Sequence, residues 1–386
     1  MPALNSIHGF IGSALIGVDP FSPRSWSGIS RFFFNECQRQ GILHGADGGD
    51  VSGVRKWFLL AMRWHPNREV WRLRYYLSPT YRRALTRVLA PAVQRLPSGV
   101  DAIQFGALFN VPSVMMNGGR CFSYHDGNMA QRLSNPFAST AVPPTLAEAA
   151  MAYEKSVYDS LDQIFTMSEY LRGSFINDFD QSPQKVVCIG AGVNLERIPE
   201  FNENRRYDAE EILFVGADFE RKGGHLLLEA FGGVRNRHPR SILHIVGPRG
   251  GPPVGLPMDG VVWHGHLRKH VSEENERLET LFRRASLFVL PSLYEPFGIA
   301  PVEAMMHGIP AVVSRGWALQ ESVAHGETGF HTPPGDAGAL CQILGQALSI
   351  PEKLRDMGKN ARRRAVERFT WKRTVSNMKK AITTAD

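Results

Sequence analysis

Hydrophobic and polar positions alternate along the chain in a pattern that favours parallel sheets with crossover helices. Short aliphatic or β-branched runs, closed by Gly, Pro, Ser or Asp, are separated by longer stretches with helical spacing. The pattern is clearest in the second half, where the apolar runs lie at 212–215, 242–246, 261–263, 287–290 and 311–313. It predicts a doubly wound α/β domain over residues 205–365.

The first half shows the same alternation with less regular spacing. Its apolar runs lie at 13–18, 102–105, 113–116, 163–166 and 185–189, with helical stretches such as 147–161 between them. The run 10–18 is too short to span a bilayer, so we interpret it as a first buried strand. The sequence therefore predicts an α/β domain over residues 1–197.

A polar run at 198–207, with Pro199 near its start, marks the boundary between these two domains. A length of 386 residues fits two domains better than one compact core. The last predicted helix, 371–383, follows a polar and basic stretch. Spacing leaves two positions open for residues 366–386: they belong to the second domain, or they cross back to the first.

Composition indicates a chain that folds throughout. Apolar residues make up 43% and charged residues 21%, close to globular averages, which excludes a long disordered arm. The four cysteines, Cys37, Cys121, Cys188 and Cys341, form no CxxC pair, and no basic n-region of a signal peptide opens the sequence. These features predict reduced thiols in a cytoplasmic protein.

The net charge of +7 is concentrated in one stretch of the chain. Residues 51–100 carry a charge of +9, which leaves about −2 for the rest. Against the single acid Glu69, the basic residues there are Arg55, Lys56, Arg63, Arg68, Arg72, Arg74, Arg82, Arg83, Arg87 and Arg95.

Aromatic residues are interleaved with these arginines. They are Trp57, Phe58, Trp64, Trp71, Tyr75, Tyr76 and Tyr81. Such a pattern over 55–95 suits an interfacial helix on anionic lipid headgroups, and it equally suits an acidic glycan or nucleic acid. The structural alternative is a pair of ordinary helices with solvated arginines and a buried aromatic side.

The loop after the run 212–215 has the composition of an anion site. It begins at Gly216, ends at Gly223 and Gly224, and carries Arg221 and Lys222 just before an apolar helix. Glycines at a helix start leave backbone N–H groups free, and the two cations add positive charge beside them. The loop favours an anion such as a diphosphate; the alternative is a tight turn with solvated basic side chains.

The loop after the run 287–290 places two carboxylates at a strand end. Glu295 lies in the loop, and Glu303 is expected in the first turn of a short helix at 301–307. Carboxylates beside exposed helix-start amides can accept hydrogen bonds from sugar hydroxyls while the amides face phosphate or sugar oxygens. Taken alone, Glu303 is also explained as an ordinary helix-start acid.

The run 292–305, followed by Gly308-Ile309-Pro310 and Glu327-Thr328-Gly329, resembles the E-x7-E signature of family 4 retaining glycosyltransferases. Phe214-Val215-Gly216 with Arg221-Lys222-Gly223 resembles the donor-diphosphate loop of that family, and 243–248 is similar to its next strand and loop. Together these motifs cover most of 211–331 in the family's order. The resemblance implies the GT-B fold, an α/β architecture of two Rossmann-like doubly wound domains that face each other across a cleft.

The resemblance also implies roles for residues of the second domain. Glu303 would hold the ribose hydroxyls, Glu295 would contact the transferred sugar, and Lys222 would neutralise the departing nucleoside diphosphate. The other donor-binding positions are Gly216, Phe297, Gly298 and Ile299. Ala217 stands where many members have an arginine, and Arg221 is our candidate to replace that charge.

In the first domain, Ser27-Gly28 resembles the family's glycine-containing loop, whose amides face the donor phosphates. Tyr124-His125-Asp126 follows an apolar strand and resembles the segment whose histidine touches the donor sugar. A lone histidine is more often structural, so His125 is a catalytic candidate only through the resemblance.

The implied reaction moves a hexose, with retention, from a nucleotide-diphosphate sugar to a glycan or lipid-linked acceptor, as in polysaccharide biosynthesis. No protein nucleophile, cofactor or metal is implied, because the leaving phosphate itself helps to deprotonate the acceptor. We interpret Asp178-Phe179-Asp180, which imitates a metal-binding DxD motif, as a polar loop. No nucleic acid partner is expected, and the protein is placed in the cytoplasm, with peripheral contact at the inner membrane face left open.

Three other classes share parts of this pattern. A nicotinamide-dependent oxidoreductase would need G-x-G-x-x-G, but Leu195 stands where the third glycine after Gly190 and Gly192 should be. A sugar-nucleotide epimerase would bind the same donor on the same fold, and a non-catalytic sugar-nucleotide sensor would bind it without turnover. Assay of the products from a panel of nucleotide sugars separates them.

Overall fold

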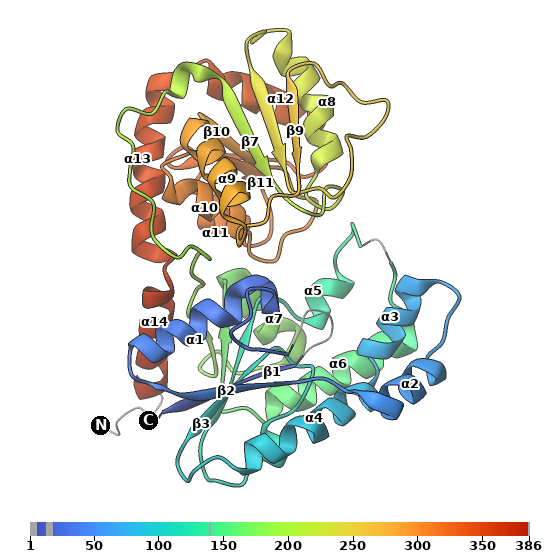
Figure 1. Ribbon diagram of the computed structural model, residues 1–386. Coiled ribbons are helices and arrows are strands. Elements are labelled where there is room, and N and C mark those ends of the chain that lie inside the picture. The colour runs from blue at the N-terminus through green and yellow to red at the C-terminus, as the bar shows by residue number, and fades with distance from the viewer. Residues whose placement is uncertain (1–5, 13–17, 139, 385–386) are drawn as a thin grey trace. The chain divides into compact units, whose positions relative to one another are not determined.

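The computed structural model describes residues 6–12, 18–138 and 140–384. The chain divides into two compact units, residues 1–194 with 371–386 and residues 195–370. Each unit contains one six-stranded parallel sheet with helices beside it (Figure 1). The inner strands are buried along most of their length, as expected for parallel sheets covered on both faces, whereas the edge strands β2 and β9 are mostly half-buried.

Unit 1 has the strand order β2-β1-β3-β4-β5-β6. The strands are β1 (Ile7–Gly12), β2 (Leu43–Gly49), β3 (Asp101–Phe105), β4 (Cys121–His125), β5 (Gln163–Thr166) and β6 (Val186–Cys188). The helices are α1 (Ile29–Arg39), α2 (Gly53–Met62), α3 (Arg68–Tyr76), α4 (Pro79–Gln94), α5 (Met129–Leu133), α6 (Pro144–Asp159), α7 (Glu169–Phe179) and α14 (Trp371–Thr384). The order reverses between β1 and β3, so the loops after these strands meet at the topological switch point, where ligands of such sheets bind.

Unit 2 has the strand order β12-β11-β10-β7-β8-β9. The strands are β7 (Glu211–Val215), β8 (Ile242–Val246), β9 (Val261–Gly265), β10 (Leu287–Leu290), β11 (Ala311–Ser314) and β12 (Gly329–Thr332). The helices are α8 (Gly224–Arg235), α9 (Ser272–Arg284), α10 (Ile299–Met306), α11 (Leu319–Ser322), α12 (Ala337–Leu348) and α13 (Pro351–Arg368). Its switch point lies between β7 and β10, which are neighbours in the sheet.

One strand prediction in the first half is wrong, and the strand β2 was not predicted. The expected strand at 113–116 is replaced by a short 3₁₀ turn, Pro112–Val114, because Pro112 cannot donate to a ladder and Asn110 caps the turn through Ser113 N–H at 3.2 Å. The strand β2 was missed because its sequence is rich in glycine, which is depleted in strands. Gly48 is needed there, since a Cβ atom would lie 1.6 Å from the Val18 carbonyl oxygen.

The first strand begins earlier in the chain than predicted. β1 covers Ile7–Gly12, and residues 13–17 of the expected run 10–18 lie outside the described part of the chain. In unit 2 the five predicted strands are present, and the short strand β12 is additional. Aliphatic runs locate these buried strands well because both of their faces need apolar side chains.

The last helix, α14, lies in unit 1, while the preceding α13 lies in unit 2. It packs against α1, and its C-terminal carbonyl groups accept hydrogen bonds from the Gln163 amide at 3.2 Å and the Arg120 guanidinium at 3.4 Å. A side chain at Gly192 would collide with Trp371, at 2.4 Å from its backbone nitrogen. Residues 366–370 therefore belong with unit 2, and the chain returns to unit 1 at Trp371.

A buried ion pair joins α4 to α6. Arg82 is 1% exposed, and its Nη2 donates to Glu154 Oε1 at 3.2 Å. The other oxygen of Glu154 accepts hydrogen bonds from the Met129 N–H and the Tyr158 hydroxyl, each at 2.9 Å. Arg82 is therefore an interior residue, although it was counted with the basic surface stretch.

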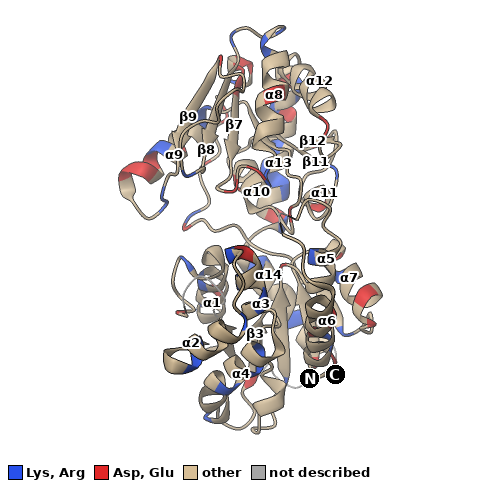
Figure 2. Cartoon of the chain, turned by 90° about the vertical axis from the view of Figure 1, so that its right-hand side faces the viewer, with Lys and Arg blue, Asp and Glu red and all other residues tan. Residues whose placement is uncertain are grey.

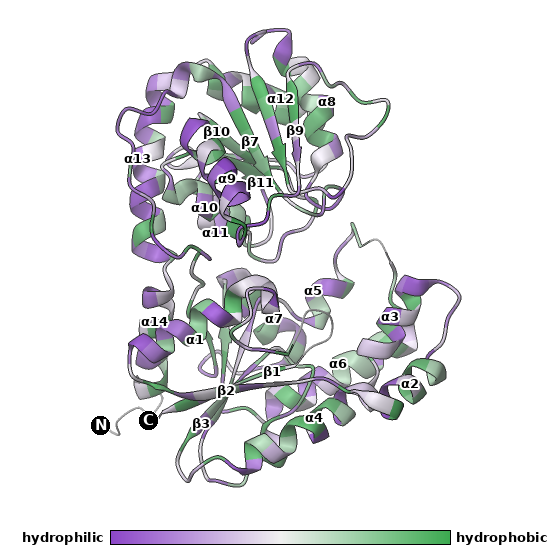
Figure 3. Cartoon of the chain, viewed as in Figure 1, coloured by the Kyte–Doolittle hydropathy of each residue, from purple (hydrophilic) through white to green (hydrophobic). Residues whose placement is uncertain are grey.

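Two further observations concern the described chain as a whole. None of its four cysteines is in a disulfide. Among its helices, none combines the length and apolar character needed to cross a bilayer. The hydropathy colouring shows the apolar strands at the centre of each unit and polar positions on the helices outside (Figure 3).

Candidate active site

The loop between β7 and α8 lies at the switch point of unit 2. Gly223 caps α8 with a positive φ of 73°. A Cβ atom there would lie 2.1 Å from the carbonyl oxygen of Pro291, in the loop after β10. Only glycine lets the two loops approach this closely, so the start of α8 lies beside the loop that carries Glu295.

A short ion pair joins these two loops. Lys222 Nζ lies 2.7 Å from Glu295 Oε2, and both side chains are largely buried, at 15% and 9% exposed. The hydroxyl of Ser292 lies 3.4 Å from the same oxygen. The structure therefore brings together the lysine and the first glutamate that the sequence singled out.

Arg221 adds a second positive charge to the pair. Its Nη1 donates to the carbonyl oxygen of Tyr294 at 2.8 Å and lies 3.6 Å from Glu295 Oε2. Its Nε donates to Asp218 at 3.0 Å, which fixes the side chain. Two cations thus share the Glu295 carboxylate, although Ala217 stands at the position where an arginine was expected.

The second glutamate of the signature is paired with a residue that the sequence analysis missed. Glu303 is 5% exposed, and its Oε1 accepts a hydrogen bond from Lys269 Nζ at 2.5 Å. Lys269 lies in the loop after β9 and belongs to no motif. Its place after a parallel strand was the only available signal, because such loops gather at one edge of the sheet.

Glu303 does not lie in the first helical turn, as was predicted. α10 begins at Ile299, two residues earlier than expected, so Glu303 is in its second turn. The earlier start follows from Gly298, which caps the helix with a positive φ of 87°. A Cβ atom at Gly298 would lie 2.5 Å from Leu319 Cδ2, so this cap also requires glycine.

The other donor-binding candidates of unit 2 frame the same loops. Gly216 is buried directly after β7, and its N–H donates to the Val246 carbonyl at 2.8 Å. Phe297 is 7% exposed, and its ring packs against Phe369 with centroids 6.2 Å apart. Ile299 is the first residue of α10 and is half-buried. The Phe297 ring therefore serves packing in this structure.

Two aromatic residues, Trp317 and the Tyr294 whose carbonyl binds Arg221, were not singled out from the sequence. Trp317, in the loop after β11, has a positive φ of 52°, which is rare for a non-glycine residue. Its ring meets that of Tyr294 edge-on, at 5.7 Å between centroids, and both are half-buried. Strained backbone of this kind gathers at functional sites, so the two rings form a candidate wall for the ligand.

In unit 1, the Ser27-Gly28 segment has the backbone geometry of an anion site. Trp26, Ser27 and Gly28 have φ values of 48°, 55° and 86°, directly before α1. Successive left-handed residues turn their N–H groups toward one concave side, which favours an anion. Asn194 holds the segment by donating to the Ser27 carbonyl at 2.9 Å. The segment follows β1, at the switch point of the unit.

His125 lies in the interior of unit 1. It ends β4, is 1% exposed, and its ring packs edge-on against Tyr158 and Phe175, at 5.5 and 5.0 Å between centroids. Among the described residues no group bonds to its Nε2, and burial lowers the pKa of the imidazole to about 3. The role of His125 as a sugar contact stays a prediction.

Burial of His125 predicts acid sensitivity. Because the pKa of His125 is lowered in the folded chain, the unfolded chain binds a proton on His125 below about pH 6.5 and the folded chain does not. We expect the free energy of unfolding to fall as pH drops below about 6.5, with His125 contributing up to about 1.4 kcal/mol per pH unit. Urea unfolding of His125→Phe across pH should show a smaller slope, whereas the exposed control His270→Phe should not. Equal slopes for His125→Phe and the unchanged protein would contradict this.

Asp178-Phe179-Asp180 lies at the end of a helix. Asp178 is in the last turn of α7 and accepts a hydrogen bond from the Ser174 hydroxyl at 2.6 Å. Asp180 caps the helix with a φ of 53°, and Phe179 is buried between them. The segment does not follow a strand, as was interpreted from the sequence, but its first two residues end a helix instead of lying in the expected polar loop.

Residues 197–364, which contain the loops described above, match the sequence profile of the family described as glycosyl transferases group 1. Unit 2 belongs to this family. The lysine and glutamate pairs at its switch point thus lie within a glycosyltransferase domain, and the resemblance noted in the sequence is confirmed at this level.

Comparison with a curated relative extends beyond this domain. The MMP alpha-(1->4)-mannosyltransferase of Mycolicibacterium hassiacum is 31% identical over 236 residues, which is 59% of this chain and 56% of that protein. The chain thus spans little more than half the length of that relative.

Solved structures match the whole chain. A sucrose-phosphate synthase from Thermosynechococcus elongatus aligns with a TM-score of 0.68 at 18% identity, over 98% of this chain and 99% of that one. HepE from Anabaena, solved in complex with UDP, aligns with a TM-score of 0.64 at 14% identity, over 98% and 100%. These likenesses confirm the fold class, α/β with two Rossmann-like domains as in GT-B glycosyltransferases.

Proposed function

We propose that this protein moves a hexose, with retention and without a metal, from a nucleotide-diphosphate sugar to a glycan or lipid-linked acceptor. The observation that carries the proposal is the convergence of Lys222 and Arg221 on Glu295 at the switch point between β7 and β10. Cations at a helix start suit a diphosphate, and a carboxylate beside them suits a sugar hydroxyl.

The Lys222–Glu295 pair explains how one site serves both parts of the donor. Without a ligand, the cations neutralise the Glu295 carboxylate, which would otherwise be a buried charge without a partner. The diphosphate then competes for Lys222 and Arg221, and Glu295 becomes an acceptor for hydroxyl groups of the sugar. During transfer the bond from the sugar to the leaving phosphate breaks, and the cations stabilise the negative charge that builds on the phosphate oxygens.

The acceptor proton needs no protein base in this scheme. The acceptor hydroxyl attacks the same face of the sugar from which the diphosphate departs, and its proton passes to a leaving phosphate oxygen. In unit 2, Glu303 would accept hydrogen bonds from the ribose hydroxyls, after sharing or releasing Lys269. In unit 1, the N–H groups around Ser27 and Gly28 suit an anion as well.

Two partner assignments complete the proposal. The mannosyltransferase relative supports sugar transfer, and the UDP bound to HepE supports a nucleotide sugar as donor. A glycan or lipid-linked molecule is the proposed acceptor. Reduced cysteines and the basic stretch 55–95 support work in the cytoplasm, with peripheral contact at the inner membrane face. Nucleic acid is not a proposed partner.

A donor screen tests the proposal. UDP-, GDP- and ADP-sugars are incubated with the protein, and the melting temperature and products are measured with and without EDTA. We expect one nucleotide class to raise the melting temperature, sugar transfer or slow hydrolysis to persist in EDTA, and the product to keep the donor's anomeric configuration. Glu303→Gln should weaken binding of that nucleotide by about 10- to 100-fold, because a charged hydrogen bond is lost. The control Glu352→Gln, at an exposed position, should leave nucleotide binding unchanged.

Each other outcome of the screen opposes the proposal. Isomerised donor without transfer would favour a sugar-nucleotide epimerase. Binding without any turnover would favour a sugar-nucleotide sensor, and loss of transfer in EDTA would overturn the metal-independent reaction.

A further inference from the structure

The helix α2 turns an apolar face outward. Val54, Trp57, Phe58, Ala61 and Met62 follow the i, i+3, i+4, i+7, i+8 spacing of one helical face, and all are exposed. The exposed fractions of the large side chains are 87% for Val54, 72% for Trp57, 62% for Phe58 and 56% for Met62, and Trp64 just beyond is 62% exposed. Leu59, on the opposite side, is buried. This much exposed apolar surface on a helix of ten residues indicates that α2 contacts a membrane or another molecule.

The neighbouring helices differ from α2. Tyr75 and Tyr81, in α3 and α4, are buried and their rings pack at 4.5 Å between centroids. Trp71 is half-buried and its indole N–H donates to the Leu60 carbonyl at 2.9 Å. The aromatic residues of 55–95 therefore form two groups: those of α3 and α4 stabilise the unit, while those of α2 and its end face solvent.

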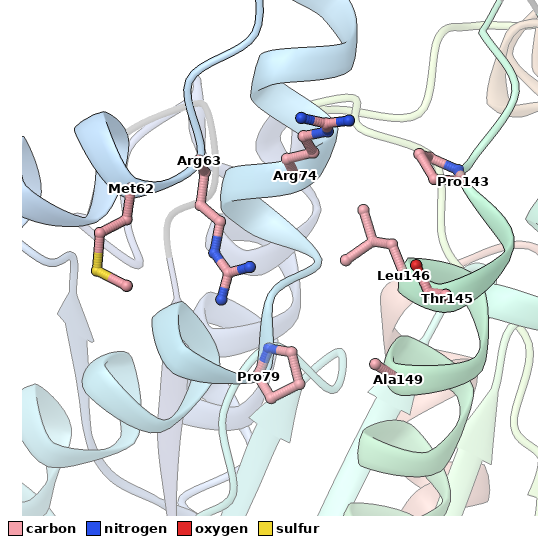
Figure 4. A pocket seen from close by; sticks show the side chains of 8 residues that line it. All are labelled: Met62, Arg63, Arg74, Pro79, Pro143, Thr145, Leu146 and Ala149. Carbon is pink, nitrogen blue, oxygen red and sulfur yellow. The ribbon is translucent and has the colours of Figure 1, made fainter.

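A pocket of about 410 Å³ adjoins the exposed face. Met62 and Arg63 at the end of α2, Arg74 on α3 and Pro79 form one side, and Thr145 and Leu146 in the first turn of α6 form the other (Figure 4). Met62 is exposed on the apolar face and also lines the pocket. The pocket and the apolar face of α2 are therefore continuous.

The two arginines of the pocket lack acidic partners. Within the described part of the chain, no carboxylate forms an ion pair with Arg63 or Arg74, and no acid lines the pocket. Arg63 donates through Nη2 to the Thr80 hydroxyl at 3.2 Å, while its buried Nε has no hydrogen-bond partner there. A buried donor without a partner is costly, and an anion in the pocket would satisfy it.

We propose that this pocket binds the phosphate group of an anionic phospholipid while the apolar face of α2 inserts into the same leaflet. The inference rests on the membrane contact proposed above and deepens it by naming the headgroup site. Two guanidinium groups next to apolar walls match a phosphate attached to hydrocarbon. A free phosphate would use the arginines alone, whereas a lipid uses the arginines and the adjoining α2 face together.

The surrounding charge fits an anionic surface. Arg55, Arg68, Arg72, Arg83 and Arg87 are exposed on α2, α3 and α4 (Figure 2 colours basic residues blue). An amphipathic helix with basic residues beside its apolar face lies in the plane of the headgroups, and its aromatic side chains reach the acyl chains. Each nearby Lys or Arg strengthens attraction to an anionic leaflet.

Vesicle flotation of the full chain tests the proposal. The probes are phosphatidylcholine vesicles with and without phosphatidylglycerol. We expect binding to the anionic vesicles, and Trp57→Ser with Phe58→Ser should weaken it by about tenfold or more, because the inserted side chains are lost. Met116→Ser, an equally exposed apolar residue elsewhere in unit 1, is the matched control and should bind as before.

The headgroup pocket is tested separately from general attraction. Arg63→Gln with Arg74→Gln should weaken binding to anionic vesicles by about tenfold more than Arg83→Gln with Arg87→Gln, which removes the same charge outside the pocket. Equal losses would overturn the pocket and leave the membrane contact standing. Absence of vesicle binding by the unchanged protein would overturn both. Melting temperature with and without the donor nucleotide is measured on every variant, so failure of donor binding is seen independently.

Discussion

Replacing Lys222 with alanine should lower the rate of sugar transfer by about 10²- to 10³-fold, the typical effect of removing one group that stabilises transition-state charge. Lys222 lies 2.7 Å from Glu295, at the start of α8, where the diphosphate of the donor is proposed to bind. The loss should appear mainly in kcat, because negative charge on the diphosphate is greatest in the transition state. Initial rates at saturating donor measure it.

The control for Lys222→Ala is Lys359→Ala, which removes an exposed lysine from α13 of the same unit. That variant should keep full activity. Arg221 remains near Glu295 in Lys222→Ala, so the carboxylate keeps a partner and the melting temperature should change little. Normal turnover by Lys222→Ala would remove the observation on which the proposed function rests.

Arg221→Ala distinguishes the two cations. Arg221 lies farther from Glu295 than Lys222 does, 3.6 against 2.7 Å, and it is also held by Asp218 and the Tyr294 carbonyl. Its removal should reduce turnover by less than that of Lys222. Unchanged turnover would reject Arg221 as the replacement for the arginine that the family places at Ala217.

Replacing Arg82 with methionine should destabilise unit 1 by about 3–5 kcal/mol, because it leaves a buried charge without its partner. Glu154 is 7% exposed and would keep only the Met129 N–H and the Tyr158 hydroxyl as donors. Urea unfolding measures the loss. The neighbouring Arg83→Met removes an exposed arginine and should change stability by no more than about 0.5 kcal/mol.

A double variant tests the cause of that loss. Arg82→Met with Glu154→Gln removes both charges and keeps a side-chain oxygen for the two remaining donors, so it should recover part of the stability lost in Arg82→Met. If Arg82→Met were no less stable than Arg83→Met, or if the double variant recovered nothing, the uncompensated charge would not be the cause.

The fold of unit 2 was predictable because its inner strands are buried on both faces and read as aliphatic runs. Unit 1 was less readable. Three of the seven residues of its edge strand β2 are glycines, so neither an apolar run nor alternation marks it. Of the apolar residues at 113–116, by contrast, Val114 and Met115 are half-buried beside a 3₁₀ turn that begins at Pro112, whereas Met116 is exposed. A short apolar run alone does not distinguish a strand from a loop.

The site was predictable to the extent that its chemistry is local in sequence. Glycine at a helix start, Lys222 in one loop and Glu295 in another are short patterns with their own physical meaning. Lys269 belongs to no such pattern, and its contact with Glu303 joins positions 34 residues apart. It becomes visible only when the loops of β9 and β10 are gathered at one edge of the sheet.

The sequence by itself determined the alternation of strands and helices and the family of unit 2. It also identified Lys222, Glu295 and Glu303 as candidate residues of a nucleotide-sugar site. The tertiary structure alone decided three other matters: which lysine meets which glutamate, that His125 is buried, and that the apolar face of α2 is exposed while Tyr75 and Tyr81 are not. The reason is physical. Periodicity states which residues share a face of a helix, but only packing decides whether that face meets the core or the solvent.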